Sequence, residues 1–435
     1  MTLRDFAVKL IWGNRVYSLF MAPFDRYTVD VKPSSSFPTD TIALNKLCRL
    51  ADSRNAAWAK GFSDLLFPSA ENIFHRKIWE FNQIIHGLRR LRRLSPDAVA
   101  LGIGCGHEEL MYFLATRLKM VYATDLYQGG YLGDEGADDV LLHPDKYAPF
   151  RYPEDRLRVL RMDARELSFE DGTFDIVFSL SALEHFGRKA DKRRALKEMN
   201  RVLKPGGVAA LTTELILNRL GWRRDYFKIR DLTELIGEAG FALSGPLDLG
   251  IEEEFASPPV AFPHEVFRTP HVIVRLFHAI FTSLSVFLVK PGDPAGKGRA
   301  LIGEEADAPT KPYLYKAGWD VVRAPARVDP GSEFSVSLKI RNEGDAIWYH
   351  NSSRSHRVRI GVWATAEDGA NLTGEPIRFS FPRNVKPGDE VMMDLNLPSL
   401  AKEGSLRLQI DLVKEYYFWF RDKGSPLLAI PIVSG

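Results

Sequence analysis

The sequence predicts an α/β domain followed by an all-β domain. Across residues 76–291, short apolar runs alternate with amphipathic segments, a pattern typical of βαβ units and a parallel sheet. Across residues 318–435, short β-patterned runs recur between turn signals, which favours a sandwich of two sheets. Residues 292–317 are rich in Gly, Ala, Pro and charged side chains, as expected of a linker.

Residues 1–75 form an N-terminal extension in this scheme. A Pro- and Ser-rich patch covers residues 33–38, and the sequence around it is irregular. Apolar spacing predicts one helix around Ile42–Leu50 and a second over Arg76–Leu94, which opens the α/β domain.

The apolar runs are the predicted strands. In the α/β domain they are Ala98–Ile103, Met120–Thr124, Leu157–Met162, Phe174–Leu180, Val208–Thr212 and Phe281–Val289. In the all-β domain they are Phe334–Ile340, Arg357–Trp363, Val391–Leu397 and Leu406–Val413. Turn signals such as Asn342-Glu343-Gly344 and Lys386-Pro387-Gly388 separate the latter group.

Composition excludes several classes of protein. The chain holds 58 Lys and Arg against 56 Asp and Glu, and 45% of its residues are hydrophobic. These values suit a folded globular protein, and the near-neutral balance gives no general sign of nucleic-acid binding. Only Cys48 and Cys105 are present, which excludes a disulfide scaffold and an all-cysteine zinc site. No metal site is predicted, and so few cysteines fit a reducing, cytoplasmic compartment.

Two segments bear on membranes. Arg4, Lys9 and Arg15 interrupt the apolar residues near position 1, so no signal peptide is expected. The most apolar stretch, Val272–Val289, contains Arg275, and a spanning helix needs about 20 mostly apolar residues. Its second half is therefore predicted to be a buried strand, and a peripheral membrane contact stays open.

The sharpest local signal is a glycine-rich turn between a strand and a helix. Residues 98–101 lead into Gly102-Ile103-Gly104-Cys105-Gly106, and a helical pattern follows. Glycines let a backbone approach a ligand closely, and a helix N-terminus favours anionic groups. Tight turns of this kind also occur without a ligand.

An acidic residue ends the next predicted strand. Asp125 can accept hydrogen bonds from both hydroxyls of a ribose there. A nicotinamide site has similar geometry, but its fingerprint requires a third glycine where this chain has His107. This departure argues against a dehydrogenase.

Further motifs follow in a fixed order. Arg161-Met162-Asp163-Ala164 ends the third strand, and Phe174–Leu180 continues into Ser181-Ala182-Leu183-Glu184-His185. An amphipathic segment then stops at Lys204-Pro205-Gly206-Gly207, before another strand. As a set, these motifs closely resemble the class I S-adenosylmethionine-dependent methyltransferases over residues 76–291.

The resemblance implies a Rossmann-like, seven-stranded sheet with a reversed last strand, and S-adenosylmethionine as the cofactor. It also implies roles for individual residues. Gly104 and Gly106 would line the methionine moiety, Asp125 would bind the ribose, Asp163 with Ala164 would meet the adenine, and Ser179 to Ser181 would lie beside the methyl donor. Gly102 and Leu126 would also belong to the cofactor site.

The turn departs from the family pattern in two places. The family usually has an acid where this chain has Gly102, and a glycine where it has Glu108. Glu108 or Glu109 could supply the missing carboxylate for the amino group of the cofactor. Alternatively, both are helix-start acids stabilised by the helix dipole. Cys105 is expected to pack within the turn.

The predicted catalytic residues are His185 and Glu214, at or just past strand ends, with Glu184 beside them. Methyl transfer mainly requires an acceptor held in line, but oxygen acceptors usually need a base. His185 is the first candidate for the base and Glu214 the second. The alternative for His185 is packing against or capping the next helix.

Two basic clusters stand out. One comprises Arg89, Arg90, Arg92 and Arg93, and the other comprises Arg188, Lys189, Lys192, Arg193 and Arg194. They could contact nucleic acid, a phosphorylated substrate or an anionic membrane, or they could be solvated helix faces balanced by acids. No known nucleic-acid module accompanies them, so no nucleic-acid partner is expected.

The all-β domain resembles bacterial immunoglobulin-like sandwich domains appended to enzymes of surface polysaccharide synthesis. The resemblance rests on Asn342–Trp348, Pro387–Asp389 and Lys414–Phe420. It implies a saccharide or glycan-linked acceptor and glycan binding by this domain. Four aromatic residues could stack on sugars or pack internally: Trp348, Trp363, Tyr416 and Trp419.

The connection Asp125–Arg156 is long for a strand–helix link and carries Tyr127, Tyr131, Tyr147 and Tyr152. We expect it to cover part of the active site on the acceptor side. The leading hypothesis is thus a methyltransferase with a saccharide-linked acceptor. The alternatives are a non-catalytic binding or assembly protein with a degenerate cofactor fold, and a small-molecule or lipid methyltransferase with a structural tail.

Overall fold

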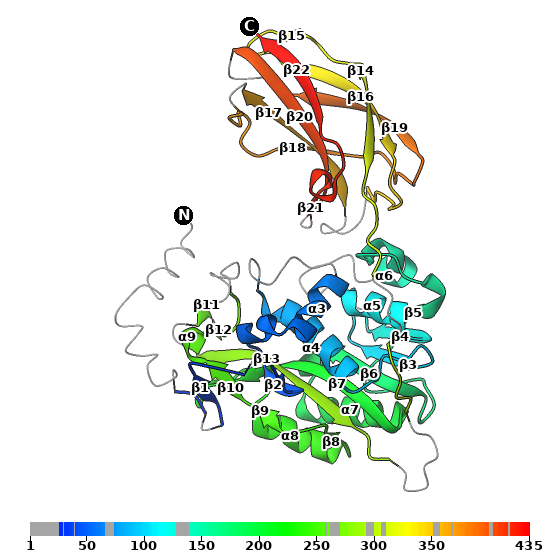
Figure 1. Ribbon diagram of the computed structural model, residues 1–435, viewed down its shortest axis with the longest axis vertical. Coiled ribbons are helices and arrows are strands. Elements are labelled where there is room, and N and C mark those ends of the chain that lie inside the picture. The colour runs from blue at the N-terminus through cyan, green and yellow to red at the C-terminus, as the bar shows by residue number, and fades with distance from the viewer. Residues whose placement is uncertain are drawn as a thin grey trace. The chain divides into compact units, whose positions relative to one another are not determined.

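The computed structural model describes most of the chain. The described residues are 26–28, 30–38, 40–65, 74–127, 139–256, 259–261, 270–292, 300–305, 310–350, 357–366, 369–399, 403–415 and 418–435. Their contacts divide the chain into two compact units (Figure 1). The first combines Met1–Tyr127 with Tyr152–Thr310, and the second combines Gln128–Arg151 with Lys311–Gly435.

A mixed sheet forms the centre of the first unit. Seven of its strands lie in the order β5 (Leu157–Arg161), β4 (Met120–Asp125), β3 (Val99–Ile103), β6 (Phe174–Leu180), β7 (Leu203–Ile216), β13 (Ala279–Val289) and β8 (Ala242–Leu243). The first five run parallel, and β13 runs antiparallel to both of its neighbours. The predicted reversed last strand is confirmed, whereas the sheet of the described residues holds 11 strands instead of the predicted seven.

Short strands extend this sheet beyond seven. They are β2 (Asn45–Leu47), β9 (Leu247–Asp248), β11 (Val260–Ala261) and β12 (Val274–Leu276), and a separate pair is formed by β1 (Lys32–Ser34) and β10 (Gly250–Glu252).

The prediction of a helix around Ile42–Leu50 is wrong. Its residues pair with β13 instead, with Leu47 opposite Leu284, and Cys48 N–H donates to the Ser283 carbonyl at 2.9 Å. A short apolar run does not distinguish a strand from a helix, and here sheet pairing decides.

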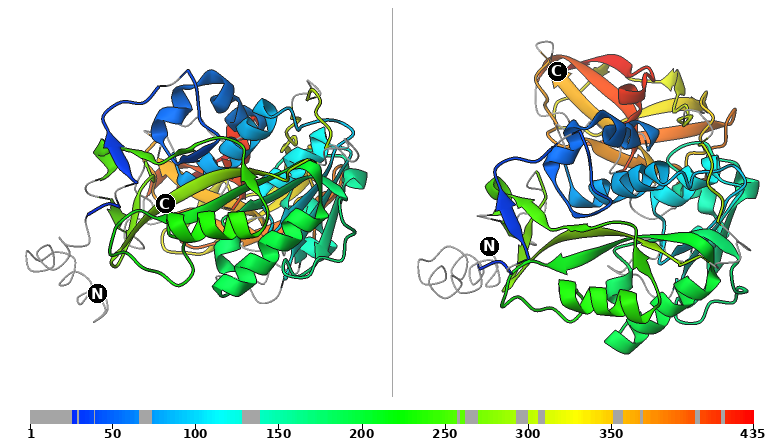
Figure 2. Two further views of the ribbon diagram at one scale, coloured as in Figure 1. Left: turned by 90° about the horizontal axis from the view of Figure 1, so that it is seen from below. Right: turned by 60° about the horizontal axis from the view of Figure 1, so that its bottom comes forward.

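Helices cover both faces of the sheet. The α-helices of the first unit are α3 (Ala56–Asp64), α4 (Arg76–Arg90), α5 (Glu109–Arg117), α7 (Lys189–Val202), α8 (Ile229–Glu238) and α9 (Glu253–Ala256), and its 3-10 turns are η2 (Leu50–Arg54), η4 (Glu154–Arg156) and η5 (Leu183–His185). Figure 2 shows α3 and α4 on one face and α7 and α8 on the other. Because both faces are covered, every residue of β6 is buried, as in other parallel sheets. A Cβ at Gly87 would clash with the Phe287 ring, so that glycine lets α4 approach β13 closely.

The second unit contains two β-sheets around one hydrophobic core. One sheet holds β14 (Ala317–Arg323), β16 (Phe334–Asn342) and β19 (Glu390–Leu397). The other holds β15 (Arg327–Val328), β22 (Leu428–Ser434), β20 (Gly404–Lys414), β17 (Val358–Ala366), β18 (Ile377–Ser380) and β21 (Phe418–Trp419). The unit also includes the short helix α6 (Asp139–Leu142) and the 3-10 turns η3 (Pro144–Tyr147) and η6 (Phe420–Lys423). Trp348 is fully buried in the core, so core packing is the correct interpretation for this indole.

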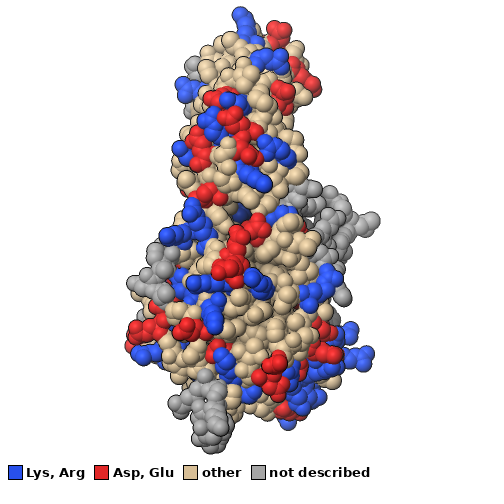
Figure 3. Space-filling model, turned by 90° about the vertical axis from the view of Figure 1, so that its right-hand side faces the viewer, with Lys and Arg blue, Asp and Glu red and all other residues tan. Residues whose placement is uncertain are grey.

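Part of the predicted linker binds to the first unit. Leu301 N–H donates to buried Asp175 at 3.0 Å, and Glu305 pairs with Arg89 at 2.5 Å and with Arg117 at 2.7 Å. Arg89 also pairs with Asp64 at 2.6 Å. Acidic residues of the same unit therefore neutralise part of the first basic cluster. Over the face shown in Figure 3, acidic and basic side chains are interspersed. No helix of the described residues is long and apolar enough to cross a bilayer.

Candidate active site

The glycine turn follows β3 and is held by β4. The N–H groups of Gly104 and Cys105 both donate to the Thr124 carbonyl, at 2.8 and 3.1 Å. Gly104 and Gly106 have φ of +69° and +47°, values that favour glycine. A Cβ at Gly102 would clash with Cys105 and Phe178. Cys105 is buried, and burial raises the pKa of its thiol, so it packs within the turn as expected.

Asp125 ties the end of β4 to this turn. Its carboxylate accepts hydrogen bonds from Gly106 N–H at 3.1 Å and from Tyr127 N–H at 3.2 Å. The Tyr127 hydroxyl, in turn, donates to the Gly106 carbonyl at 2.9 Å. These bonds fix the carboxylate at the carboxyl edge of the sheet, where ligands bind in open α/β sheets. Leu126 is 42% exposed next to it.

The other tyrosines of the long connection pack internally where they are described. Tyr147 is buried and donates to Asp139 at 3.1 Å, and Tyr152 stacks edge-on against Tyr112 with ring centres 5.1 Å apart. Tyr131 lies outside the described residues. The predicted covering role of this connection stays a prediction.

Asp163 already has a partner. Arg165 donates to it through its backbone N–H at 2.9 Å and through its guanidinium at 2.6 Å. The hydrogen bonds from Arg165 lower the pKa of Asp163. Ala164 is buried in the core beneath. The pair lies after β5, and about a third of each charged side chain is exposed.

Glu108 is the N-cap residue of α5, but its carboxylate makes no capping hydrogen bond. Its Oε2 atom is buried and finds no hydrogen-bond partner among the described residues. Burial is the main reason that its pKa lies well above the usual range, with Glu80 and Asp125 adding repulsion and Lys77 opposing it. A cation placed against a buried carboxyl group stabilises its ionised form.

Glu80 connects the predicted residues around Ser181. It lies on α4, is 1% exposed, and accepts hydrogen bonds from Ser181 and Thr212, each at 2.9 Å, and from Ser283. Ser181 has φ of +45°, which is strained for a non-glycine residue and is typical of functional sites. Ser179 points into the interior, and its hydroxyl has no partner among the described residues.

Glu214 lies deep in the same polar cluster. Arg76 hydrogen-bonds to it, and Lys77 lies 3.5 Å away. Burial alone would raise the pKa of Glu214, but Arg76 and Lys77 outweigh burial and lower it. Glu184 accepts from Glu214 N–H at 3.0 Å and from the Thr213 hydroxyl at 2.8 Å. Burial, together with the charge of Glu214, raises the pKa of Glu184 to about 7.

His185 ends η5 at the surface, next to this cluster. Desolvation by the surrounding protein lowers the pKa of its imidazole, although Asp225 and Glu214 act in the opposite direction. The neutral ring can therefore accept a proton at neutral pH. The structure brings together Ser181, Glu184 and Glu214, and His185 borders them.

Sequence reasoning missed two parts of the site. The first part comes from α4, the helix that precedes the glycine turn, and consists of Arg76, Lys77 and Glu80. The sequence signal that could have identified it was a charged residue at a core-facing position of an amphipathic helix.

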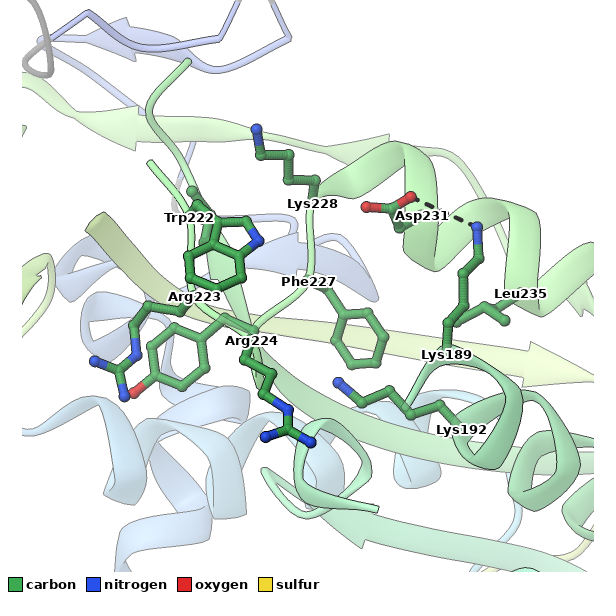
Figure 4. A pocket seen from close by; sticks show the side chains of 11 residues that line it. Lys189, Lys192, Trp222, Arg223, Arg224, Phe227, Lys228, Asp231 and Leu235 are labelled. Atoms are coloured by element: carbon green, nitrogen blue, oxygen red, sulfur yellow. Dashed lines mark ion pairs between the residues drawn. The ribbon is translucent and has the colours of Figure 1, made fainter. Parts of the chain in front are cut away.

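The second part is a pocket of about 180 Å³ beside the end of β7 (Figure 4). It is lined by Lys189, Lys192, Ile216, Trp222, Arg223, Arg224, Tyr226, Phe227, Lys228, Asp231 and Leu235. Among the described residues, no cluster of acids, histidines and cysteines could hold a metal ion.

Some side chains of the second basic cluster line this pocket, and others lie on the solvent-facing side of the helix. Arg193 pairs with Glu238 at 2.5 Å and Arg194 with Glu166 at 3.2 Å, as expected for a balanced helix face. Lys192, in contrast, is 4% exposed and points into the pocket.

Comparison with known proteins identifies the domain. The family model of the methyltransferase domain matches residues 101–211. Sterol 4-C-methyltransferase strm-1 of Caenorhabditis elegans is 30% identical over 115 residues, or 26% of this chain and 30% of the relative. The 27-O-demethylrifamycin SV methyltransferase of Amycolatopsis mediterranei (strain S699) is 29% identical over 137 residues, or 30% of this chain and 44% of the relative. The chain thus spans less than half the length of these curated relatives.

Solved structures of methyltransferases are also similar to about half of the chain. A SAM-dependent methyltransferase of Methanosarcina mazei covers 46% of this chain and 96% of its own, with 16% identity and a TM-score of 0.31. Residues 101–211 thus match a methyltransferase domain, for which the sequence resemblance implies S-adenosylmethionine as the cofactor.

The residues around the turn fit this cofactor. The unpartnered Oε2 of Glu108 can accept from an ammonium group, and Asp125 keeps acceptor capacity beyond its two N–H bonds. No described atom outside residues 105–107 lies within 4 Å of a Cβ built at Gly106, so a ligand has room against the backbone there.

Proposed function

We propose that this chain is an S-adenosylmethionine-dependent methyltransferase with a saccharide or glycan-linked acceptor. One observation carries the proposal: the methyltransferase-domain match encloses a glycine turn whose Gly106 N–H is hydrogen-bonded to Asp125. Asp125 would hold the ribose, Glu108 the amino group and the backbone at Gly104 and Gly106 the methionine chain. The cofactor supplies a methyl group that its positively charged sulfur already activates.

The chain itself has to orient the acceptor and remove its proton. His185 suits the role of base, because its lowered pKa keeps the imidazole neutral at physiological pH. Glu214, the other candidate, suits it less well, because Arg76 and Lys77 stabilise its ionised form. We assign Glu214 to positioning the cluster in which Ser181 and Glu184 lie.

A cavity in the second unit supports a saccharide-related role. It measures about 290 Å³ and is lined by Trp363, Asn371, Glu375, Pro376, Arg378, Trp419 and Arg421. The two indoles meet edge-on with ring centres 5.4 Å apart, and Arg378 lies over Trp419 at 4.6 Å. Indole edges beside amide, carboxylate and guanidinium groups can bind a sugar through both apolar contacts and hydroxyl hydrogen bonds. Tyr416 lies outside the described residues.

Two alternatives have their own support. The names of the relatives, a sterol and a rifamycin methyltransferase, favour a small-molecule acceptor and a structural second unit. The altered turn, with Gly102 and Glu108 at the family's acid and glycine positions, favours a binding protein without activity.

Calorimetric titration with S-adenosylmethionine tests the proposal. We expect binding by the full chain and at least tenfold weaker binding by Asp125→Ala, because charge-assisted hydrogen bonds to the ribose are lost. The control Asp155→Ala removes an exposed carboxylate outside the site and should bind like the parent. No binding at millimolar cofactor would leave the binding-protein alternative.

The proton-accepting role of His185 needs an activity measurement. Release of S-adenosylhomocysteine is followed against pH with candidate sugars for the parent, His185→Gln and His185→Ala. Full activity of His185→Ala removes this histidine as the base.

A further inference from the structure

We propose that the pocket beside β7 binds a phosphate ester carried by the methyl acceptor. This inference deepens the proposed function and rests on it. The pocket contains five cationic side chains, Lys189, Lys192, Arg223, Arg224 and Lys228, and a single lining acid, Asp231. Its volume of about 180 Å³ lies below the roughly 300–1,000 Å³ of typical small-molecule sites, which suits one charged substituent better than a whole acceptor.

Among the residues that the structure describes, most of this positive charge has no carboxylate partner. Lys189 is neutralised by Glu234 at 2.9 Å and Asp231 at 3.6 Å. Lys192, in contrast, pairs with no carboxylate of the described chain and donates only to the Asp225 carbonyl, at 3.1 Å. An ammonium that is 96% buried with one neutral acceptor keeps donors for an anion.

The arginines contribute further unused donors. The Nε of Arg223 is buried without a partner among the described residues, while its guanidinium lies 4.9 Å from the Tyr226 ring centre. Arg224 is exposed at the pocket mouth. In Figure 4, Lys192 and Arg224 extend to the same side of Phe227, whereas Lys228 extends to the other. A phosphate between Lys192 and Arg224 would receive charge-assisted hydrogen bonds from two elements.

The backbone links this pocket to the catalytic cluster. Phe227 N–H donates to the Glu214 carbonyl at 3.1 Å, and Ile216 N–H donates to the Phe227 carbonyl at 2.8 Å. The charges of Asp225 and Lys192 also act on His185. A phosphate held here would therefore place the rest of the acceptor next to the proposed base, with Trp222, 63% exposed, available to contact a sugar ring.

Binding of glucose 1-phosphate to the full chain tests the inference by calorimetry, with glucose as the uncharged comparison. We expect glucose 1-phosphate to bind and glucose to bind at least tenfold more weakly. Inorganic phosphate should compete, whereas chloride at equal ionic strength should compete far less. Arg224→Ala should weaken binding at least tenfold, and Lys192→Met should do the same while keeping the fold, as judged by circular dichroism.

The matched control is Arg194→Ala, which removes an exposed arginine that faces Glu166 outside the pocket. Equal losses in Arg224→Ala and Arg194→Ala, or no binding of glucose 1-phosphate at 10 mM, would overturn the inference. Binding only to phosphatidylglycerol vesicles, lost in Arg224→Ala, would assign the pocket to a lipid headgroup and also overturn it. S-adenosylmethionine titrations of the same samples report separately on the proposed function.

Discussion

Glu80 accepts a hydrogen bond from the Ser181 hydroxyl at 2.9 Å, although 101 positions separate the two residues along the chain. The same carboxylate binds Thr212 on β7 and Ser283 on β13, and it lies 3.3 Å from Lys77. One buried side chain of α4 thus joins two strands of the sheet, β7 and β13, to the residue that directly follows β6. It also hydrogen-bonds Ser181, whose backbone is strained, beside the polar cluster that contains Glu184 and Glu214.

Glu80→Ala should destabilise the first unit strongly. The substitution leaves Arg76 and Lys77 without one of their carboxylates and leaves three hydroxyls without an acceptor, a loss of about 3–5 kcal/mol for a buried ion pair. Thermal unfolding followed by circular dichroism measures the effect. Glu166→Ala, which removes an 81% exposed carboxylate, should shift the transition little. Equal melting temperatures for Glu80→Ala and the parent would contradict a structural role for Glu80.

The geometry of the glycine turn and Asp125 could be predicted because each motif is local and its conformation depends on neighbouring residues. Gly104, Gly106 and Asp125 lie at the ends of strands that the apolar runs identify. Glu80 could not be assigned a partner in this way, because Ser181 meets it only after the sheet has assembled. The segment containing Arg223 and Arg224 carries no periodic pattern, so its place beside Lys192 emerges only from the fold.

Glu184 should make stability depend on pH. Its pKa is about 7 in the folded protein, against about 4.3 in an unfolded chain. Between these values the folded state keeps a proton that the unfolded state has released, so stability falls as pH rises from about 4.5 to 7. Glu184→Gln keeps an acceptor for Glu214 N–H and should flatten this part of the curve. Denaturation at a series of pH values measures it, and parallel curves for parent and variant would exclude an elevated pKa.

Glu108→Gln should weaken S-adenosylmethionine binding about tenfold through loss of a charge-assisted contact with the amino group. The sharper test uses 5′-methylthioadenosine, which shares the adenosine part but lacks the amino-acid part. Its affinity should be the same for parent and variant in calorimetry. An equal loss for both ligands would indicate a damaged turn, and no loss for either would show that Glu108 does not contact the amino group.

The imidazoles of His75 and His271 stack with their ring centres 4.2 Å apart beside Arg76. Burial and the positive charge of Arg76 lower the pKa of His75 to about 3 and that of His271 to about 4. In an unfolded chain both would titrate near 6.5. The unfolded state therefore takes up protons that the folded state excludes, and the stability present above pH 6.5 is lost as the pH falls toward 4.

Both ring nitrogens of His271 are buried without a partner among the described residues, so an apolar ring can replace the imidazole there. His271→Phe should keep the fold and show a shallower loss of melting temperature between pH 6.5 and 4. His143→Gln, which changes an exposed histidine, should keep the slope of the parent. If His271→Phe and the parent lose stability equally with falling pH, the stacked pair does not carry the acid sensitivity.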